Sequence, residues 1–130
     1  MKTFTFRFDP KASMDGMFDR FKEAAKSRKP QIRSDEMRSN SVAAMLSSMT
    51  AGRIELFYTI ANSKPDSVYQ VAQLLKRDAA NVLRDVKILE GIGLVSLITE
   101  KDGGRERSRP VADYDRILFD FGAASKTDAA

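Results

Sequence analysis

The 130-residue sequence contains no cysteine, which excludes disulfide bonds and thiolate metal sites. A chain without cysteine suits a reducing compartment, and we expect a cytoplasmic protein. The N-terminal stretch MKTFTFRFDP lacks a long apolar segment and a small-residue cleavage site, so it does not resemble a signal peptide. Uninterrupted apolar runs are only a few residues long, which is too short to cross a membrane. We therefore expect no membrane partner.

Histidine is also absent, and with it the commonest general base, the commonest metal ligand and the Ser-His and Cys-His nucleophile pairs. A carboxylate-based nuclease is the enzymatic alternative that remains. Its acidic residues would be Asp113, Asp115 and Asp120. Alternation along a strand puts Asp113 and Asp115 on one face and Asp120 on the other, which disfavours a metal site. We therefore expect no enzymatic activity, no cofactor and no metal ion.

Positive charge is unevenly distributed. The chain has 22 Lys and Arg residues against 18 Asp and Glu residues, for a formal net charge of +4. The basic stretch between residues 20 and 38 contains Arg20, Lys22, Lys26, Arg28, Lys29, Arg33 and Arg38. Such a stretch attracts polyanions, but its composition also suits a solvated linker. Both interpretations stay open at this point.

The N-terminal segment predicts a strand followed by a helix. Phe4, Phe6 and Phe8 alternate with polar residues, the pattern of a half-buried strand, which should end at Asp9-Pro10. Between residues 12 and 26 an apolar stripe at helical spacing contains Met14, Met17, Phe18, Phe21, Ala24 and Ala25. A polar, proline-containing connector follows. We expect an N-terminal extension over residues 1–33, a main domain over residues 34–121 and a disordered tail over residues 122–130.

Four helices are expected in the main domain. A short one spans residues 41–49, and a second begins after Thr50, a candidate N-cap. Ser67 should cap the third helix and Asp78 the fourth, with a turn of a few residues between them, as in a helix-turn-helix. The expected buried positions of the second and third helices are Ile54, Phe57, Tyr58, Ile60, Ala61, Val68, Val71, Ala72, Leu74 and Leu75.

Two strands should follow the fourth helix, which Gly91 or Gly93 can end. LVSLIT and SRPVA predict a hairpin around Gly103-Gly104, and YDRILFDF alternates like another strand. The expected fold is therefore mainly α with a small β component (α+β), a winged helix-turn-helix with an N-terminal strand-helix extension.

The fourth helix supplies the candidate DNA-binding residues. Val82, Val86 and Leu89, at helical spacing, should face inward. The opposite face should then expose Asn81, which can pair with adenine, and Arg84, which can pair with guanine or a phosphate. The full candidate set is Lys76, Arg77, Ala80, Asn81, Arg84, Lys87, Arg105, Arg107 and Arg109, in which the lysines and the remaining arginines would contact phosphates or a minor groove.

Alternatives exist for each of these roles. Arg84 could pair with Glu90 or with neighbours of Asp85, and Asn81 could bond locally. Asp85 should lie on the same side as Arg84, where it could orient that arginine, accept from cytosine or lie on the edge of the interface. The hairpin also carries Glu100, Asp102 and Glu106, so its net positive charge is small.

A family resemblance covers roughly residues 49–121. The segment SVYQVAQLLKRDAANVLRDVKILEGIGLVSL resembles the MarR-like winged helix-turn-helix regulators, in particular a prokaryotic subgroup of DNA-binding proteins often paired with toxins as antitoxins. The matching residues are Thr50, Arg53, Glu55, Ser67, Ala72, Arg77, Asp78, Asn81, Val82, Asp85, Val86, Gly93-Leu94-Val95, Arg109-Pro110-Val111, Tyr114-Asp115 and Ile117. The resemblance implies DNA binding as a homodimer and transcriptional repression. It also implies base or phosphate contact by Arg77, Asn81 and Arg84, and hairpin contact by Arg105 and Arg107.

The sequence thus favours a sequence-specific repressor that binds double-stranded DNA as a homodimer, with an antitoxin role and a toxin partner as one form of that function. The alternative is a winged helix used only for protein–protein contact. The Phe4/Phe6/Phe8 strand and the Ile117/Phe119/Phe121 strand can pair within one chain or across a two-fold axis. The methionine-rich stripe is a candidate dimer face or toxin-docking surface.

Overall fold

A computed structural model of the chain describes residues 2–11 and 35–122. The expected helix over residues 12–26 and most of the expected C-terminal tail lie outside the described residues. Within the described part, the fold is mixed α and β. It divides into two compact units, the first formed by the described residues up to 50 and from 114 to 122, and the second by residues 51–113. No helix in the described part is long and apolar enough to span a membrane.

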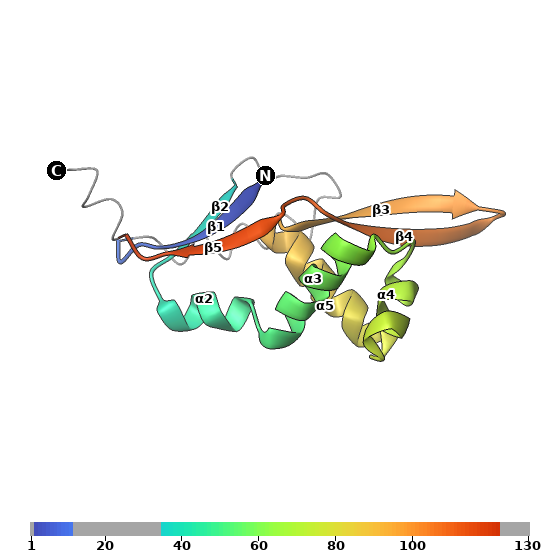
Figure 1. Ribbon diagram of the computed structural model, residues 1–130, viewed down its shortest axis with the longest axis horizontal. Helices are drawn as coiled ribbons and strands as arrows, with labels where there is room; N and C mark the ends of the chain where they lie inside the picture. Colours follow the sequence, from blue (N-terminus) through green and yellow to red (C-terminus); the bar gives the residue numbers. More distant parts are fainter. Residues whose placement is uncertain (1, 12–34, 123–130) are drawn as a thin grey trace. The chain divides into compact units, whose positions relative to one another are not determined.

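The first unit is built on a three-stranded parallel sheet (Figure 1). Its strands are β1 (Thr3–Phe8), β2 (Glu36–Ser39) and β5 (Arg116–Asp120), in the order β2-β1-β5. Helix α2 (Val42–Ser48) contacts β1 and β2. It begins where the Ser41 hydroxyl accepts a hydrogen bond from the Ala44 amide at 3.2 Å, which caps the helix.

The two faces of this sheet follow from the alternation in β1. Phe4 and Phe6 are buried, and the ring of Phe6 stacks on Phe119 with centroids 5.2 Å apart. On the other face, Arg7 donates to Glu36 at 3.0 Å and to Asp120 at 2.8 Å, which ties the three strands together. Of the two pairings left open by the sequence, the structure has β1 and β5 paired within one chain.

The division into units differs from the expected boundary at residue 34. Residues 35–50 and 114–122 belong with β1, because β2 and β5 both pair with it. The sequence predicted a connector that extends to Glu36 and no strand at this position. A four-residue strand with Met37 as its one large apolar side chain has too short a pattern to be recognised.

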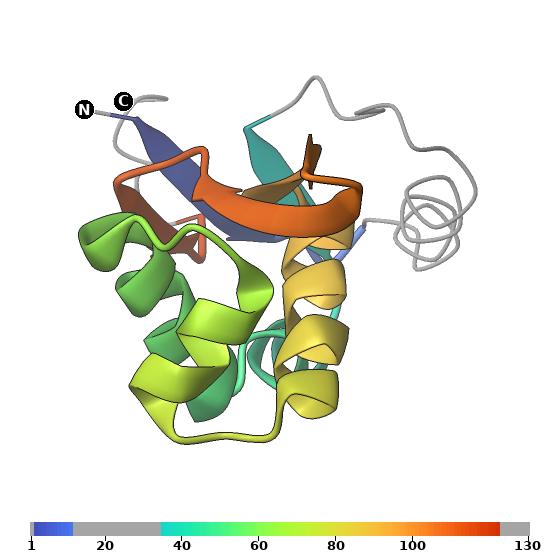
Figure 2. The ribbon, with the colours of Figure 1, turned by 90° about the vertical axis from the view of Figure 1, so that its right-hand side faces the viewer.

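The second unit combines three helices with an antiparallel hairpin (Figure 2). The helices are α3 (Ala51–Ser63), α4 (Val68–Leu75) and α5 (Ala79–Ile92). The hairpin consists of β3 (Val95–Asp102) and β4 (Arg105–Ala112). Its two-residue loop is formed by Gly103 and Gly104, with φ of 60° and 87°, a backbone conformation that favours glycine.

The core of the second unit confirms the buried face of the fourth helix and corrects part of the other two. Phe57, Ile60, Val68, Val71 and Ala72 are buried as expected. Val82, Val86 and Leu89 are fully buried, as expected. In α3, however, Leu56 is buried while Ile54 and Tyr58 are exposed, and Leu74 in α4 is exposed as well. Both helices have apolar residues around most of their circumference. Contacts of α3 with α5 and β4, and of α4 with α5, therefore decide which side is buried.

Candidate nucleic-acid interface

A tight turn between α4 and α5 positions the candidate residues. Helix α4 begins at Ser67, whose hydroxyl accepts from the Gln70 amide at 3.0 Å. It ends at Lys76, which adopts the left-handed conformation with φ of 54°. Asp78 then caps α5 by accepting from the Asn81 amide at 3.2 Å. Both N-caps predicted from the sequence are confirmed, because Ser and Asp side chains satisfy the free amides of a first helical turn.

Helix α5 has one anchored face and one outer face. The anchored face is Val82, Val86 and Leu89, all buried in the core. The outer face consists of Ala80, Asn81, Arg84 and Lys87, which are all exposed. Arg84 donates from Nη1 to Oδ1 of Asn81 at 3.1 Å, so the two candidate base-reading side chains support each other in solvent. Gly93, with φ of 107°, ends the helix.

Asp85 lies beside the outer face but is not part of it. Its carboxylate accepts from Nε of Arg53 at 3.2 Å and from Nη2 of Arg77 at 2.8 Å. Of the roles expected for Asp85, orienting Arg84 is wrong in this structure, because Asp85 binds Arg53 and Arg77 while Arg84 binds Asn81. Burial alone raises the pKa of the Asp85 carboxyl, but the hydrogen bonds from Arg77 and Arg53 outweigh it and leave the pKa below its ordinary value.

Arg77 takes a different role from the phosphate contact expected of it. Its side chain is only 31% exposed and pairs with Asp85. Its Nη1 atom is buried and has no hydrogen-bond partner in the described residues. A Cβ atom on Gly52 would lie 3.8 Å from this nitrogen, so the guanidinium reaches the first turn of α3. In this conformation Arg77 connects α3, the turn and α5 inside the second unit.

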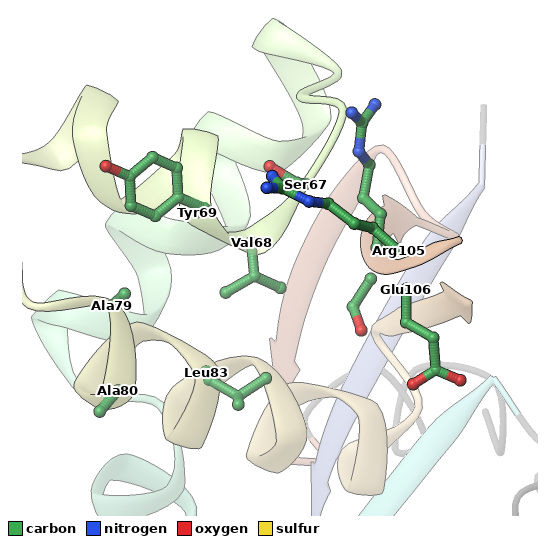
Figure 3. Close-up of a pocket in the computed structure, with 10 residues that line it drawn as sticks. Ser67, Val68, Tyr69, Ala79, Ala80, Leu83, Arg105 and Glu106 are labelled. Atoms are coloured by element: carbon green, nitrogen blue, oxygen red, sulfur yellow. The ribbon is translucent and has the colours of Figure 1, made fainter. Parts of the chain in front are cut away.

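A groove runs between the start of both helices and the hairpin, with a volume of about 640 Å³. Its walls are lined by Ser67, Val68, Tyr69, Ala79, Ala80, Leu83, Arg105, Glu106, Arg107 and Ser108. Figure 3 shows Val68 directed toward Leu83, with the small side chains of Ala79 and Ala80 at the start of α5. The groove thus joins an apolar floor to a rim that carries two arginines.

The hairpin arginines differ in exposure. Arg105 and Arg107 are exposed, whereas Arg109 is partly buried and donates from Nε to Glu100 at 2.8 Å. Cross-strand register places Glu100 opposite Arg107 and Lys101 opposite Glu106. Opposite charges therefore face each other along the hairpin, which offsets its positive charge as the sequence indicated.

Of the nine candidate residues, six are exposed polar or charged groups, one is the small residue Ala80, and two are partly buried arginines paired with carboxylates. Ala80, Arg105 and Arg107 line the groove. The exposed polar and charged residues are Lys76, Asn81, Arg84, Lys87, Arg105 and Arg107. The paired residues are Arg77 and Arg109.

Sequence reasoning missed Arg53 and Tyr69. Arg53 was noted only as part of the family resemblance, although it holds Asp85. Tyr69 lines the groove with 65% of its surface exposed. Its position opposite the buried Val68, Val71 and Ala72 on α4 is the signal that could have identified it.

The three carboxylates of the nuclease alternative have other partners. Asp113 accepts from the Ser96 hydroxyl at 2.7 Å in the second unit. In the first unit Asp115 accepts from the Lys2 amide at 2.9 Å, and Asp120 pairs with Arg7. Among the described residues, no group of three or more acidic side chains is arranged to hold a metal ion.

Comparison with known proteins places the chain in a family. A family model described as HVO_A0114 matches residues 48–119, which is more than half of the chain. The chain belongs to the HVO_A0114 family. The HVO_A0114 match runs from the end of α2 into β5 and includes α3, α4, α5 and the hairpin. No curated protein and no solved structure matches the chain.

Proposed function

We propose that this HVO_A0114 protein is a sequence-specific transcriptional repressor that binds double-stranded DNA through its second unit. In this proposal the unit is a winged helix-turn-helix, with α4 and α5 as the two helices and the β3–β4 hairpin as the wing. One observation carries it: Val82, Val86 and Leu89 are buried on one side of α5, while Asn81 and Arg84 are exposed on the other.

The outer face has the chemistry needed to read base edges. The Asn81 amide can form two hydrogen bonds with adenine, and the Arg84 guanidinium can form two with guanine. Ala79 and Ala80 have small side chains, so the start of α5 can approach a major groove closely. The hydrogen bond between Arg84 and Asn81 would be exchanged for contacts with bases, at little cost because both groups are exposed.

Phosphate contacts would position the helix. Lys76 lies in the turn before α5, Lys87 on its outer face, and Arg105 and Arg107 on the rim of the groove. Four phosphate contacts give a slope of about −3.6 for log K against log salt. A rise from about 50 to about 200 mM salt should therefore weaken binding on the order of 100-fold.

The proposal includes a homodimer in the cytoplasm. One helix of this kind reads only a few base pairs, so specific affinity normally requires two half-sites about one helical turn apart. The resemblance of Ser67–Leu97 to MarR-like regulators supports this assembly. An antitoxin role, with a toxin as a protein partner, is the form of the function that the same resemblance implies.

A second candidate function is protein–protein contact without DNA. Tyr58, Tyr69 and Leu74 are large side chains that are 65%, 65% and 54% exposed on α3 and α4. Exposed aromatic and apolar side chains are frequent at protein interfaces. In that case the groove would receive a peptide rather than a phosphate backbone.

Fluorescence anisotropy with the DNA upstream of the protein's own coding sequence tests the proposal. Arg84→Ala should weaken binding about 10-fold, because a good base contact contributes roughly 1–3 kcal/mol. Lys64→Ala removes an exposed cation at the end of α3, outside the groove lining, and should leave affinity unchanged. Equal affinity of the parent and Arg84→Ala would refute the assigned reading helix, and no binding at moderate salt would favour the protein-contact function.

A further inference from the structure

The two edges of the parallel sheet in the first unit differ in how they are protected. Edge strands of natural proteins are normally short, charged, or interrupted by proline or a bulge, because an open edge pairs with other strands. The β2 edge is four residues long and carries Glu36 and Arg38. The β5 edge, RILFD, has charges only at its two ends, Arg116 and Asp120, and exposes 49% of Leu118 between them. Among the described strands, none pairs with the outer side of β5.

The pairing of β5 with β1 determines which residues of β5 direct their backbone N–H and C=O groups outward. The Arg116 amide donates to the Lys2 carbonyl at 3.2 Å, in the parallel register that pairs Thr3 with Arg116. Successive residues of a strand direct their backbone groups to opposite sides. Residues 116, 118 and 120 therefore face β1. Ile117 and Phe119 direct their N–H and C=O groups outward, where another strand can pair with them.

We propose that β5 pairs with β5 of a second copy of this chain, antiparallel, across a two-fold axis at Leu118. Ile117 would then exchange two backbone hydrogen bonds with Phe119 of the second copy, and the symmetry repeats the pair. Leu118 would face its own counterpart in a non-hydrogen-bonded pair, in which side chains lie closest. The two three-stranded sheets would become one continuous six-stranded sheet.

The charged residues of β5 favour the register with the two-fold axis at Leu118. With the axis at Leu118, Arg116 lies directly opposite Asp120 of the second copy, and the symmetry repeats that pair as well. Opposite charges directly across an antiparallel pair stabilise it. Asp120 already accepts from Arg7 on Oδ2 and from the Gly122 amide on Oδ1, but a carboxylate has about four lone-pair sites and can also accept from a second guanidinium.

Neighbouring registers lose this match. Moving the axis to Phe119 places Leu118 opposite Asp120, and moving it to Ile117 places Leu118 opposite Arg116. A charged group then faces an apolar one, and both Arg116–Asp120 pairs are lost. The sequence of β5 is thus complementary to itself about Leu118, which commits the edge to a second copy rather than to an unrelated strand.

This inference goes beyond the proposed function and does not depend on DNA binding. It names a dimer surface in the first unit, whereas the proposed DNA-binding residues all lie in the second. Failure of DNA binding would therefore leave the strand pairing intact, and failure of the pairing would leave the reading helix intact.

A single cysteine tests the pairing, because the chain has none of its own. Leu118→Cys should form a covalent dimer on mild oxidation, since residues in a non-hydrogen-bonded antiparallel pair lie within disulfide range. Leu46→Cys, at an α2 position that is 56% exposed, is the matched control and should remain monomeric on a denaturing gel without reductant. Equal cross-linking of both variants, or none at position 118, would overturn the proposal.

Light scattering on the full chain provides a second measurement. The parent and Leu118→Val should have twice the mass of one chain. Leu118→Asp should be a monomer at micromolar concentration, because it sets two carboxylates face to face. Circular dichroism of Leu118→Asp should match the parent, since position 118 is half exposed within one chain. A monomeric parent, or a Leu118→Asp variant that dimerises like the parent, contradicts the pairing.

Discussion

Asp85 accepts a hydrogen bond from Arg77 at 2.8 Å, a contact that joins α5 to the turn preceding it. The same carboxylate accepts from Arg53 on α3 at 3.2 Å. Two arginines that could have neutralised phosphates are thus used within the protein. The direction in which α5 presents Asn81 and Arg84 depends on this cluster as well as on the apolar core.

Replacement of Asp85 by Asn should affect both stability and DNA affinity. The substitution removes the charge that compensates Arg53 and Arg77, so we expect the free energy of unfolding to fall by about 2 kcal/mol. The affinity for DNA should fall as well, because α5 loses one of its anchors. Urea denaturation and anisotropy measure the two effects. The control is Glu55→Gln, which changes an exposed carboxylate and should alter neither quantity.

Stability should decline in acid through the same carboxylate and through Glu36. Hydrogen bonds from Arg38, followed by those from Arg7, hold the pKa of Glu36 below its ordinary value despite partial burial, and the pKa of Asp85 is also lowered. A carboxyl with a lowered folded-state pKa stabilises the fold above its unfolded pKa, about 4, and loses that contribution as pH falls through the folded value.

We therefore expect the urea midpoint to be steady near neutrality and to drop below about pH 4. Asp85→Asn and Glu36→Gln should each have a shallower drop than the parent. A parent midpoint that rises on acidification would show that these ion pairs do not stabilise the fold.

Glycine substitutions of two lysines that share a backbone conformation can distinguish an effect on stability from an effect on DNA binding. Lys64 and Lys76 have φ of 46° and 54°, which a glycine adopts without strain. Glycine at either position should raise the free energy of unfolding by up to about 1 kcal/mol. Only Lys76→Gly should weaken DNA binding and reduce the salt slope by about 1, because only Lys76 is a proposed phosphate contact. The same affinity for both variants would exclude Lys76 from the interface.

The hairpin arginines should differ in their effect on salt dependence. Arg105→Ala and Arg107→Ala should each reduce the salt slope by about 1, the value for one phosphate contact. Arg109→Ala should reduce it less, because Arg109 is already paired with Glu100. Anisotropy titrations at several salt concentrations give the slopes. If Arg109→Ala had the largest effect, the hairpin would approach DNA by its returning strand instead of its tip.

Local signals identified much of the second unit in advance. Ser67 and Asp78 were predicted as N-caps, Gly91 or Gly93 as a helix end and Gly103-Gly104 as a hairpin loop, because each depends on the chemistry of one residue or on a backbone conformation. The buried face of α5 was predicted as well, since Val82, Val86 and Leu89 form one clear stripe between polar residues. The α3 stripe was right at Phe57 and Ile60 but wrong at Ile54 and Tyr58, because the apolar residues of this helix gave the pattern no unique phase.

The sequence by itself determined where helices begin and end and which residues of α5 face outward, because capping and helical periodicity act over a few neighbouring residues. Only the tertiary structure decided that Arg77 turns inward to Asp85, and that β5 joins β1 more than a hundred residues away in the chain. These outcomes depend on burial and on charges brought together from distant segments. No local pattern encodes the partner of a charge or of a strand.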